Sequence, residues 1–317
     1  MISRLKIFFL ELSSACYDLV FFLKHSFKKS KLNEKSKFSA HLTKQYHVVE
    51  KGLALPKPRP GFGEKKIKLL IRDTRIYEQQ FGTDFLTQNV VSVIKSYVDF
   101  HIRIGFKLNE EYNKVLLDFY DDRSTELKGL STGGVEVYKH LTSEISTHQF
   151  LMSRKSVRNF KDTHVSHATI LQAIDIAKYA PSVCNRQGWK AHMYDEPNQI
   201  ASLLDLQTGN KGFSHLINTL IIITGDMNFF TDFERNQLYV DGGLFAQNLM
   251  LALHSYGLVT CPLNTCRPFH IENKIKSIGH IDRSERLIMF LAVGEPRHDV
   301  MVPKSQRRSS ESFLIKH

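Results

Sequence analysis

Two continuous apolar runs late in the chain restrict the fold more than any other feature of the sequence. The first, Leu220–Ile223, lies inside the apolar stretch 216–224, and the second is Leu287–Gly294. Each run is typical of a strand that is buried on both faces of a sheet. Between them lies Asp241–Tyr256, an apolar stretch of helical length that is stopped by Gly257. This alternation predicts an α/β or α+β fold, in which helices flank a sheet.

The first half of the chain has a different pattern, which predicts a mostly helical, basic extension over residues 1–146. Apolar residues recur with helical spacing between Lys65 and Phe119. Before them lies a Pro- and Gly-rich loop, 51–63, whose alternating prolines exclude a helix. Residues 1–66 carry 14 Lys and Arg against 5 Asp and Glu, which is +9 of the formal net charge of +11. Such an arm favours an anionic neighbour, with a solvated helical surface as the alternative.

Apolar side chains near the N-terminus predict an amphipathic helix. They are Leu5, Phe8, Phe9, Leu12, Cys16, Leu19, Val20 and Leu23. Glu11 and Asp18 interrupt the run and no small-residue cleavage site follows, which argues against a membrane span and a signal peptide. We expect the helix to pack on its own protein; peripheral contact of residues 1–35 with the inner membrane is the alternative. The four cysteines have no zinc or Cys-x-x-Cys spacing, so we expect no metal site and a reducing cytoplasm.

Two motifs in the second half carry most of the chemistry. Residues 153–160 read Ser-Arg-Lys-Ser-Val-Arg-Asn-Phe and place three cations around hydroxyl groups. Residues 180–189 read Ala-Pro-Ser-Val-Cys-Asn-Arg-Gln-Gly-Trp, a turn of small and amide side chains that ends on the only tryptophan. A flavin mononucleotide needs cations and hydroxyls for its phosphate and ribityl chain, amides for its ring edge, and a flat apolar wall.

These motifs, followed in order by 257–265 and 303–308, resemble the FMN-dependent nitroreductase family in a long form with an N-terminal extension. The resemblance covers about residues 149–317 and implies a nitroreductase-like mixed sheet with flanking helices, in a domain spanning 147–317. It further implies FMN as cofactor, NAD(P)H as co-substrate, and a homodimer with the flavin in its interface. By the same resemblance, 257–265 is a loop along the flavin ring.

The resemblance also implies the site residues. Arg158 and Asn264 are the implied catalytic residues, Arg158 at the pyrimidine edge of the flavin and Asn264 near its N5 atom. The implied cofactor-binding residues are Arg154, Lys155, Ser156, Arg158, Pro181, Ser182, Asn185, Gln187, Pro262, Leu263, Asn264, Lys304, Arg307 and Arg308. Ser182 and Asn185 would reach the flavin of the partner subunit, and spacing does not decide between Arg307 and Arg308 at the phosphate. Gly188 stands where the family usually has proline, which predicts a looser turn.

The implied function is hydride transfer from NAD(P)H through flavin N5 to a small-molecule acceptor. The basic extension suits an anionic acceptor, and the long form resembles members encoded with surface-polysaccharide genes. The 51–63 loop is then either a lid over the flavin or a linker between the extension and the core. The alternative function is a catalytically weak adaptor that keeps the fold at a membrane-associated assembly. Nucleic-acid binding is not expected, because no recognition fold supports it.

Overall fold

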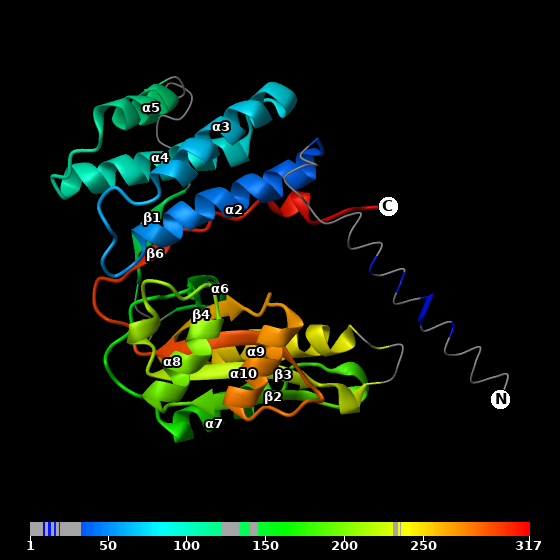
Figure 1. The fold of residues 1–317 in the computed structure, drawn as a ribbon. Coiled ribbons are helices and arrows are strands. Elements are labelled where there is room, and N and C mark those ends of the chain that lie inside the picture. Colours follow the sequence, from blue (N-terminus) through cyan, green and yellow to red (C-terminus); the bar gives the residue numbers. More distant parts are fainter. Residues whose placement is uncertain are drawn as a thin grey trace. The chain divides into compact units, whose positions relative to one another are not determined.

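The computed structural model of the 317-residue chain describes residues 33–121, 133–139, 145–230, 234 and 236–317, with five single positions nearer the N-terminus (Figure 1). These five are Phe9, Leu12, Ser13, Cys16 and Leu19; the rest of the predicted amphipathic helix lies outside the described residues. The chain divides into two compact units, Met1–Glu136 with Met301–His317, and Val137–Val300. Within the described part of the chain, no helix combines the length and the apolar character needed to cross a bilayer.

The first unit is built mainly of helices, as the helical spacing predicts. Its helices are α2 (Lys35–Leu53), α3 (Glu64–Phe81), α4 (Phe85–Arg103) and α5 (Glu110–Asp121). Their apolar faces form one core that includes Leu42, Ile67, Ile94 and Leu116, each 0% exposed. Asp84 fixes the start of α4, because its carboxylate accepts the backbone N–H groups of Leu86 and Thr87 and completes a capping box. The short strands β1 (Val135–Val137) and β6 (Met301–Pro303) pair with each other.

The Pro- and Gly-rich loop between α2 and α3 is fastened to its own unit. A Cβ atom on Gly52 would lie 2.3 Å from the Phe62 ring, so only glycine lets this ring pack against α2. The Tyr97 hydroxyl donates to the Phe62 carbonyl at 2.8 Å, and the Gly61 N–H donates to His101 Nε2 at 2.9 Å. Since both partners belong to α4, the loop is a folded part of the first unit and not a free linker.

The second unit contains a four-stranded sheet in the order β2-β3-β5-β4. The strands are β2 (Trp189–Tyr194), β3 (Thr219–Asp226), β5 (Glu285–Gly294) and β4 (Val259–Asn264), and every neighbouring pair is antiparallel. The two apolar runs of the sequence become β3, which is buried at every position, and β5, so these predictions are confirmed. An isolated parallel bridge joins Ser156 to Thr260 beside β4.

Helices pack on this sheet, which confirms the predicted combination of sheet and flanking helices. α9 (Gln237–Ser255) and α7 (His167–Ala177) pack against each other and share one apolar core with β3 and β5. Ser166 caps α7, because its Oγ accepts the Thr169 N–H at 3.1 Å. On the opposite face, Tyr194 donates to the Gly279 carbonyl of α10 (Phe269–Gly279). The remaining helices are α6 (Thr147–Ser153) and α8 (Pro197–Leu206).

Candidate functional site

The first motif runs along the outer edge of β4. α6 ends at Ser153, and the chain then extends so that the Val157 N–H donates to the Thr260 carbonyl at 3.0 Å. Phe160 packs so closely on Gly294 that a Cβ there would lie 2.9 Å from the ring. These contacts bring the first and third predicted motifs together, although they are about a hundred residues apart in the sequence.

Arg158 is the most informative residue of this segment. It is only 7% exposed, and its Nη1 donates to the Ser156 carbonyl at 3.2 Å. Its Nε is buried and has no hydrogen-bond partner among the residues that the structure describes. An uncompensated buried guanidinium is costly, because burial disfavours a charge that nothing pairs. Arg158 therefore fits an anionic group that is bound next to it.

Arg154 follows α6 and lies close to a buried histidine. His254, near the end of α9, is 2% exposed; Ser153 Oγ lies 2.8 Å from its Nε2, and the Phe150 ring stacks on it. Burial and then the nearby Arg154 charge lower the pKa of His254 to about 4. The imidazole is thus neutral at pH 7 and holds the residue before Arg154. Sequence reasoning missed this pair, because nothing local connects Ser153 to His254.

The second motif is a tight turn that is closed by its own side chains. Cys184, Asn185 and Gln187 adopt left-handed backbone angles, with φ of 50°, 54° and 52°. The Gln187 N–H donates to Ser182 Oγ at 3.1 Å, and Gln187 Nε2 donates to the Asn185 backbone and side-chain oxygens. Asp241 of α9 accepts the Val183 N–H at 3.1 Å. Asn185, Gln187 and Pro181 are exposed on the surface of the second unit.

Gly188 does not loosen this turn, contrary to the prediction. A Cβ at this position would lie 2.8 Å from side-chain atoms of Phe229 and of Phe230, and the Gly188 carbonyl accepts the Asp226 N–H at 2.8 Å. Trp189 stacks on Phe245 of α9, with ring centroids 5.0 Å apart and an interplanar angle of 11°. Glycine is therefore needed for close packing, and the tryptophan anchors the turn to α9.

The third motif is a strand and not the loop that the resemblance implies. Pro262, Leu263 and Asn264 belong to β4 and pair with Leu291, Phe290 and Met289 of β5. Because the Thr260 carbonyl points to Val157, alternate residues of the strand turn their backbone groups away from β5. Pro262 is one of these residues, and it is tolerated because no N–H is needed at an edge.

Asn264 shares this outward direction at the end of β4. Its carbonyl accepts from Gln207 Nε2 at 3.0 Å, and its Oδ1 accepts the Cys266 N–H at 3.1 Å. These two contacts fix the backbone and the side-chain amide at the strand edge. The backbone N–H of Asn264 points to the same side as the Val157–Thr260 contact. The outer edge of β4, along which the first motif runs, therefore offers a hydrogen-bond donor at this residue.

The fourth motif groups with the first unit. Lys304 donates its N–H to the Gly134 carbonyl, and the Arg308 guanidinium lies 4.6 Å from the centroid of the Phe313 ring. Arg307 is exposed. Their contact with a phosphate stays a prediction.

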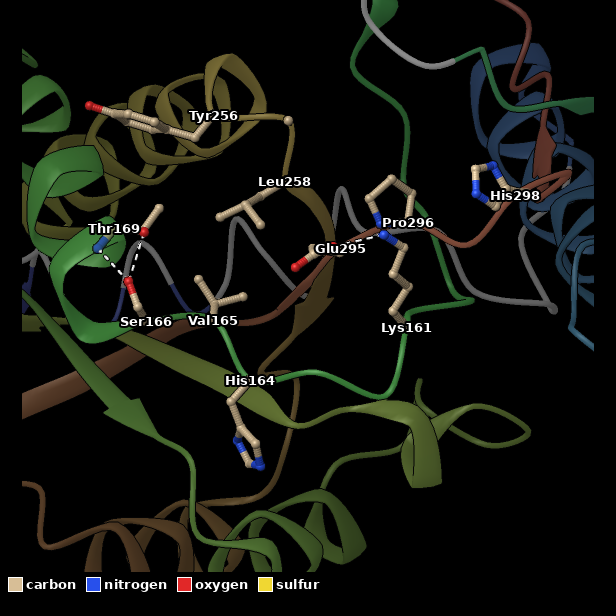
Figure 2. A pocket seen from close by; sticks show the side chains of 11 residues that line it. Lys161, His164, Val165, Ser166, Thr169, Tyr256, Leu258, Glu295, Pro296 and His298 are labelled. Atoms are coloured by element: carbon tan, nitrogen blue, oxygen red, sulfur yellow. Dashed lines mark hydrogen bonds and ion pairs between the residues drawn. The ribbon is translucent and has the colours of Figure 1, made fainter.

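A cavity of about 520 Å³ lies elsewhere in the second unit (Figure 2). It is lined by Lys161, His164, Val165, Ser166, Thr169, Tyr256, Gly257, Leu258, Glu295, Pro296 and His298, none of which is a predicted flavin residue. Lys161 Nζ and Glu295 Oε2 form an ion pair of 2.9 Å, which Figure 2 shows between the two side chains. The lining shares no residue with the predicted cofactor-binding set, although Gly257 and Leu258 begin the third motif. Its two opposite charges, Lys161 and Glu295, pair with each other.

Comparison with known proteins gives one family for the second unit. Residues 151–212 and 217–295 match the model of the Nitroreductase family. A 4-nitrobenzoate reductase from Pseudomonas putida is 27% identical over 192 residues, which cover 45% of this chain and 82% of that protein.

Similar solved structures include an FMN-dependent nitroreductase from Clostridium difficile, which is 18% identical in sequence. The match covers 53% of this chain and 94% of that chain, with a TM-score of 0.43. A nitroreductase family protein from Streptococcus pneumoniae is 22% identical in sequence. The match covers 54% of this chain and 100% of that chain, with a TM-score of 0.46. The family match itself falls entirely within Val137–Val300.

Proposed function

Because residues 151–212 and 217–295 match the model of the Nitroreductase family, we propose that the chain is an FMN-dependent oxidoreductase that uses NAD(P)H. The observation that carries the proposal is the buried guanidinium of Arg158, whose Nε has no partner among the described residues. It lies on the segment that is hydrogen-bonded to β4, so a cation and a strand edge face the same region.

The residues of this region fit FMN. When bound, FMN supplies the transfer of a hydride from the nicotinamide to the acceptor. Arg158 places a fixed positive charge at the pyrimidine edge, where it stabilises negative charge that develops on the ring. Arg154 and Ser156, with Lys155 between them, hold the phosphate and ribityl end, and the neutral His254 keeps α6 in place before them.

The outer edge of β4 orients the ring. Pro262 and Leu263 form a wall beside the flavin ring. The backbone N–H of Asn264 is the donor for the ring edge that carries N5. A donor that is held by the strand needs no reorganisation when the ring binds, which favours one orientation.

We extend the proposal to a homodimer. Large apolar side chains are exposed on α6, on α7 and just after it, and on α9: Leu151 (52%), Met152 (70%), Leu171 (48%), Tyr179 (83%), Val240 (53%) and Leu244 (42%). Exposure on this scale favours burial against a partner. A second copy would cover these helices, and the exposed Asn185 could then reach a flavin in the other subunit together with Ser182.

The acceptor is proposed to be a small anionic molecule in the cytoplasm, in line with the basic extension. A role in surface-polysaccharide metabolism stays a prediction, as does the alternative of an adaptor at a membrane-associated assembly.

The test is the flavin content of the purified protein. We expect yellow protein with flavin absorbance that oxidises NADH or NADPH in the presence of a quinone or nitroaromatic acceptor. Arg154→Ala and Ser156→Ala should each lose flavin and activity. Arg283→Ala, at an exposed arginine of the second unit, is the matched control and should keep both. A colourless protein that added FMN cannot reconstitute would contradict the proposal.

A further inference from the structure

The first unit contains a cavity of about 500 Å³ of its own. It lies where the 51–63 loop enters α3, against the second half of α2. Its lining consists of Val48, Val49, Arg59, Phe62, Gly63, Glu64, Lys65 and Lys66. A volume of this size is typical of sites for small molecules.

The charges that line this cavity are not balanced. Its single carboxylate, Glu64, is already engaged by Lys68, which lies outside the lining, at 2.8 Å. The side chains of Arg59, Lys65 and Lys66 have no ion pair or hydrogen bond with any residue in the described part of the chain. Three exposed cations therefore line the cavity without a counter-charge among the described residues, and an external anion would relieve their mutual repulsion.

The wall beneath these cations is apolar and held in place. Val49 is 2% exposed, and the Phe62 ring packs over Gly52. The Tyr97 hydroxyl holds the Phe62 carbonyl, and the two rings lie 5.2 Å apart. Because the wall is fixed by contacts within the unit, little ordering is needed when a ligand enters.

We propose that this cavity binds a small amphipathic anion. The apolar body of the ligand lies on Val48, Val49 and Phe62, and its anionic group meets Arg59, Lys65 and Lys66. This site is separate from the oxidoreductase site proposed above, and it does not depend on that proposal.

The experiment uses two matched probes and the full-length protein. The probe 8-anilinonaphthalene-1-sulfonate is an amphipathic anion, and N-phenyl-1-naphthylamine is the same molecule without the sulfonate. Binding of each is measured by equilibrium dialysis, and flavin content is measured in parallel. The test variant is Lys65→Glu/Lys66→Glu. The control is Lys107→Glu/Lys114→Glu, which changes the charge equally at two exposed lysines of the same unit outside the cavity.

The sulfonate probe should bind the test variant at least tenfold more weakly than the unmodified protein or the control. The neutral probe should bind all three proteins within about twofold, since the apolar wall is intact. Raising the salt concentration should weaken sulfonate binding to the unmodified protein and have much less effect on the test variant.

Three results would overturn the inference: equal sulfonate affinity in the test variant, an equal loss in the control, or an equal loss for the neutral probe. A loss of flavin in the test variant would also overturn it, because the cavity would then belong to the flavin site. Colourless protein that still shows the tenfold effect would contradict only the proposed oxidoreductase function.

A lipid headgroup and a soluble metabolite share this chemistry, and vesicles separate them. If Lys65 and Lys66 meet a lipid, the protein should sediment with phosphatidylglycerol vesicles and not with phosphatidylcholine vesicles, and the test variant should lose this binding. If the protein does not sediment while the sulfonate probe binds, the anion is a soluble molecule.

Discussion

The two cavities have nearly the same volume, about 520 and 500 Å³, but they treat charge in opposite ways. In the second unit, Lys161 and Glu295 both line the cavity and form an ion pair with each other. In the first unit, the carboxylate of Glu64 is engaged by Lys68, so the cations at the opening stay uncompensated. Volume alone therefore says little about binding, and a charge that the fold leaves unpaired is the more specific indication of a ligand.

Buried charges in the second unit show the same contrast. Glu285 is 2% exposed, and it accepts hydrogen bonds from Lys190 at 2.9 Å, His192 at 2.7 Å and Thr224. Burial raises the pKa of Glu285, but these hydrogen bonds outweigh burial and lower it. Arg158 is buried to a similar degree without such compensation. Glu285 is thus compensated within the sheet, whereas the buried Nε of Arg158 has no partner among the described residues, which is why we propose that Arg158 meets a ligand.

The largest effect is expected for Arg158→Met. Loss of a buried cation that pairs with a bound anion should weaken FMN binding by about a thousandfold, or about 4 kcal/mol. The apoprotein should be at least as stable as the unmodified one, because an uncompensated buried charge is removed. FMN titration and urea unfolding of the apoprotein measure the two quantities.

Glu285→Gln is the matched comparison, with the opposite outcome expected. It should reduce the stability of the apoprotein by about 2 kcal/mol, because it disrupts a satisfied buried network, and leave FMN affinity within a few-fold. If Arg158→Met lowers apoprotein stability as much as Glu285→Gln does, Arg158 is a structural residue and the contrast fails.

The second prediction concerns acid and uses the depressed pKa of His254. Its folded pKa of about 4 lies below the ordinary histidine value of 6.5, so the folded state favours the neutral imidazole. The stability that this provides is fully present above pH 6.5 and is lost as the pH falls towards 4. The loss amounts to about 3 kcal/mol over that window. Urea unfolding between pH 7 and pH 4 measures it, with Trp189 as a probe inside the second unit.

His254→Gln should lose less stability than the unmodified protein over the same window, while His270→Gln, at an exposed position, should behave like the unmodified protein. The first unit contains a second histidine whose neutral form takes part in a contact between the 51–63 loop and α4. His101 accepts the Gly61 N–H, and burial lowers its pKa. Parallel pH profiles of His254→Gln and the unmodified protein would rule out the assignment to His254.

What the sequence predicts well is what local patterns determine. The strands β3 and β5 follow from continuous apolar runs, and the start of α7 follows from Ser166. β4 was not predicted as a strand, because the family resemblance implied a loop over 257–265. Only the sheet around it shows that the proline lies on an edge that needs no donor.

The candidate site was predicted only in part, for a similar reason. The family resemblance singles out Arg154, Ser156 and Arg158, but no spacing in the sequence shows that this segment is bonded to Thr260. The same holds for the pairing of Ser153 with His254 and for the unpaired cations around the first unit's cavity. Such features depend on contacts between segments that are far apart in the chain, and these are set by tertiary packing.

The third prediction is Gly52→Ala, which tests whether the wall of the first cavity is as fixed as proposed. The added methyl group would overlap the Phe62 ring, and displacing a packed ring costs about 2 kcal/mol. Replacing glycine in a helix recovers about 1 kcal/mol, so a net loss of about 1 kcal/mol is expected. Binding of the neutral probe should weaken with it, whereas FMN affinity should not change. Unchanged probe binding would show that the wall adapts.

The smallest effect is expected for Lys161→Met in the second cavity. The pair with Glu295 is about half exposed, at 43% and 45%, so water screens it and removal should cost less than about 0.5 kcal/mol. Removing the lysine leaves Glu295 as an unpaired carboxylate that can still be hydrated, so the cavity should not gain affinity for the sulfonate probe. Urea unfolding and equilibrium dialysis check both points. If Lys161→Met instead changed flavin content or sulfonate binding, Lys161 would contribute to ligand binding although Glu295 already pairs with its charge. Whether the charges that line a cavity are paired would then not distinguish a binding site from a structural cavity.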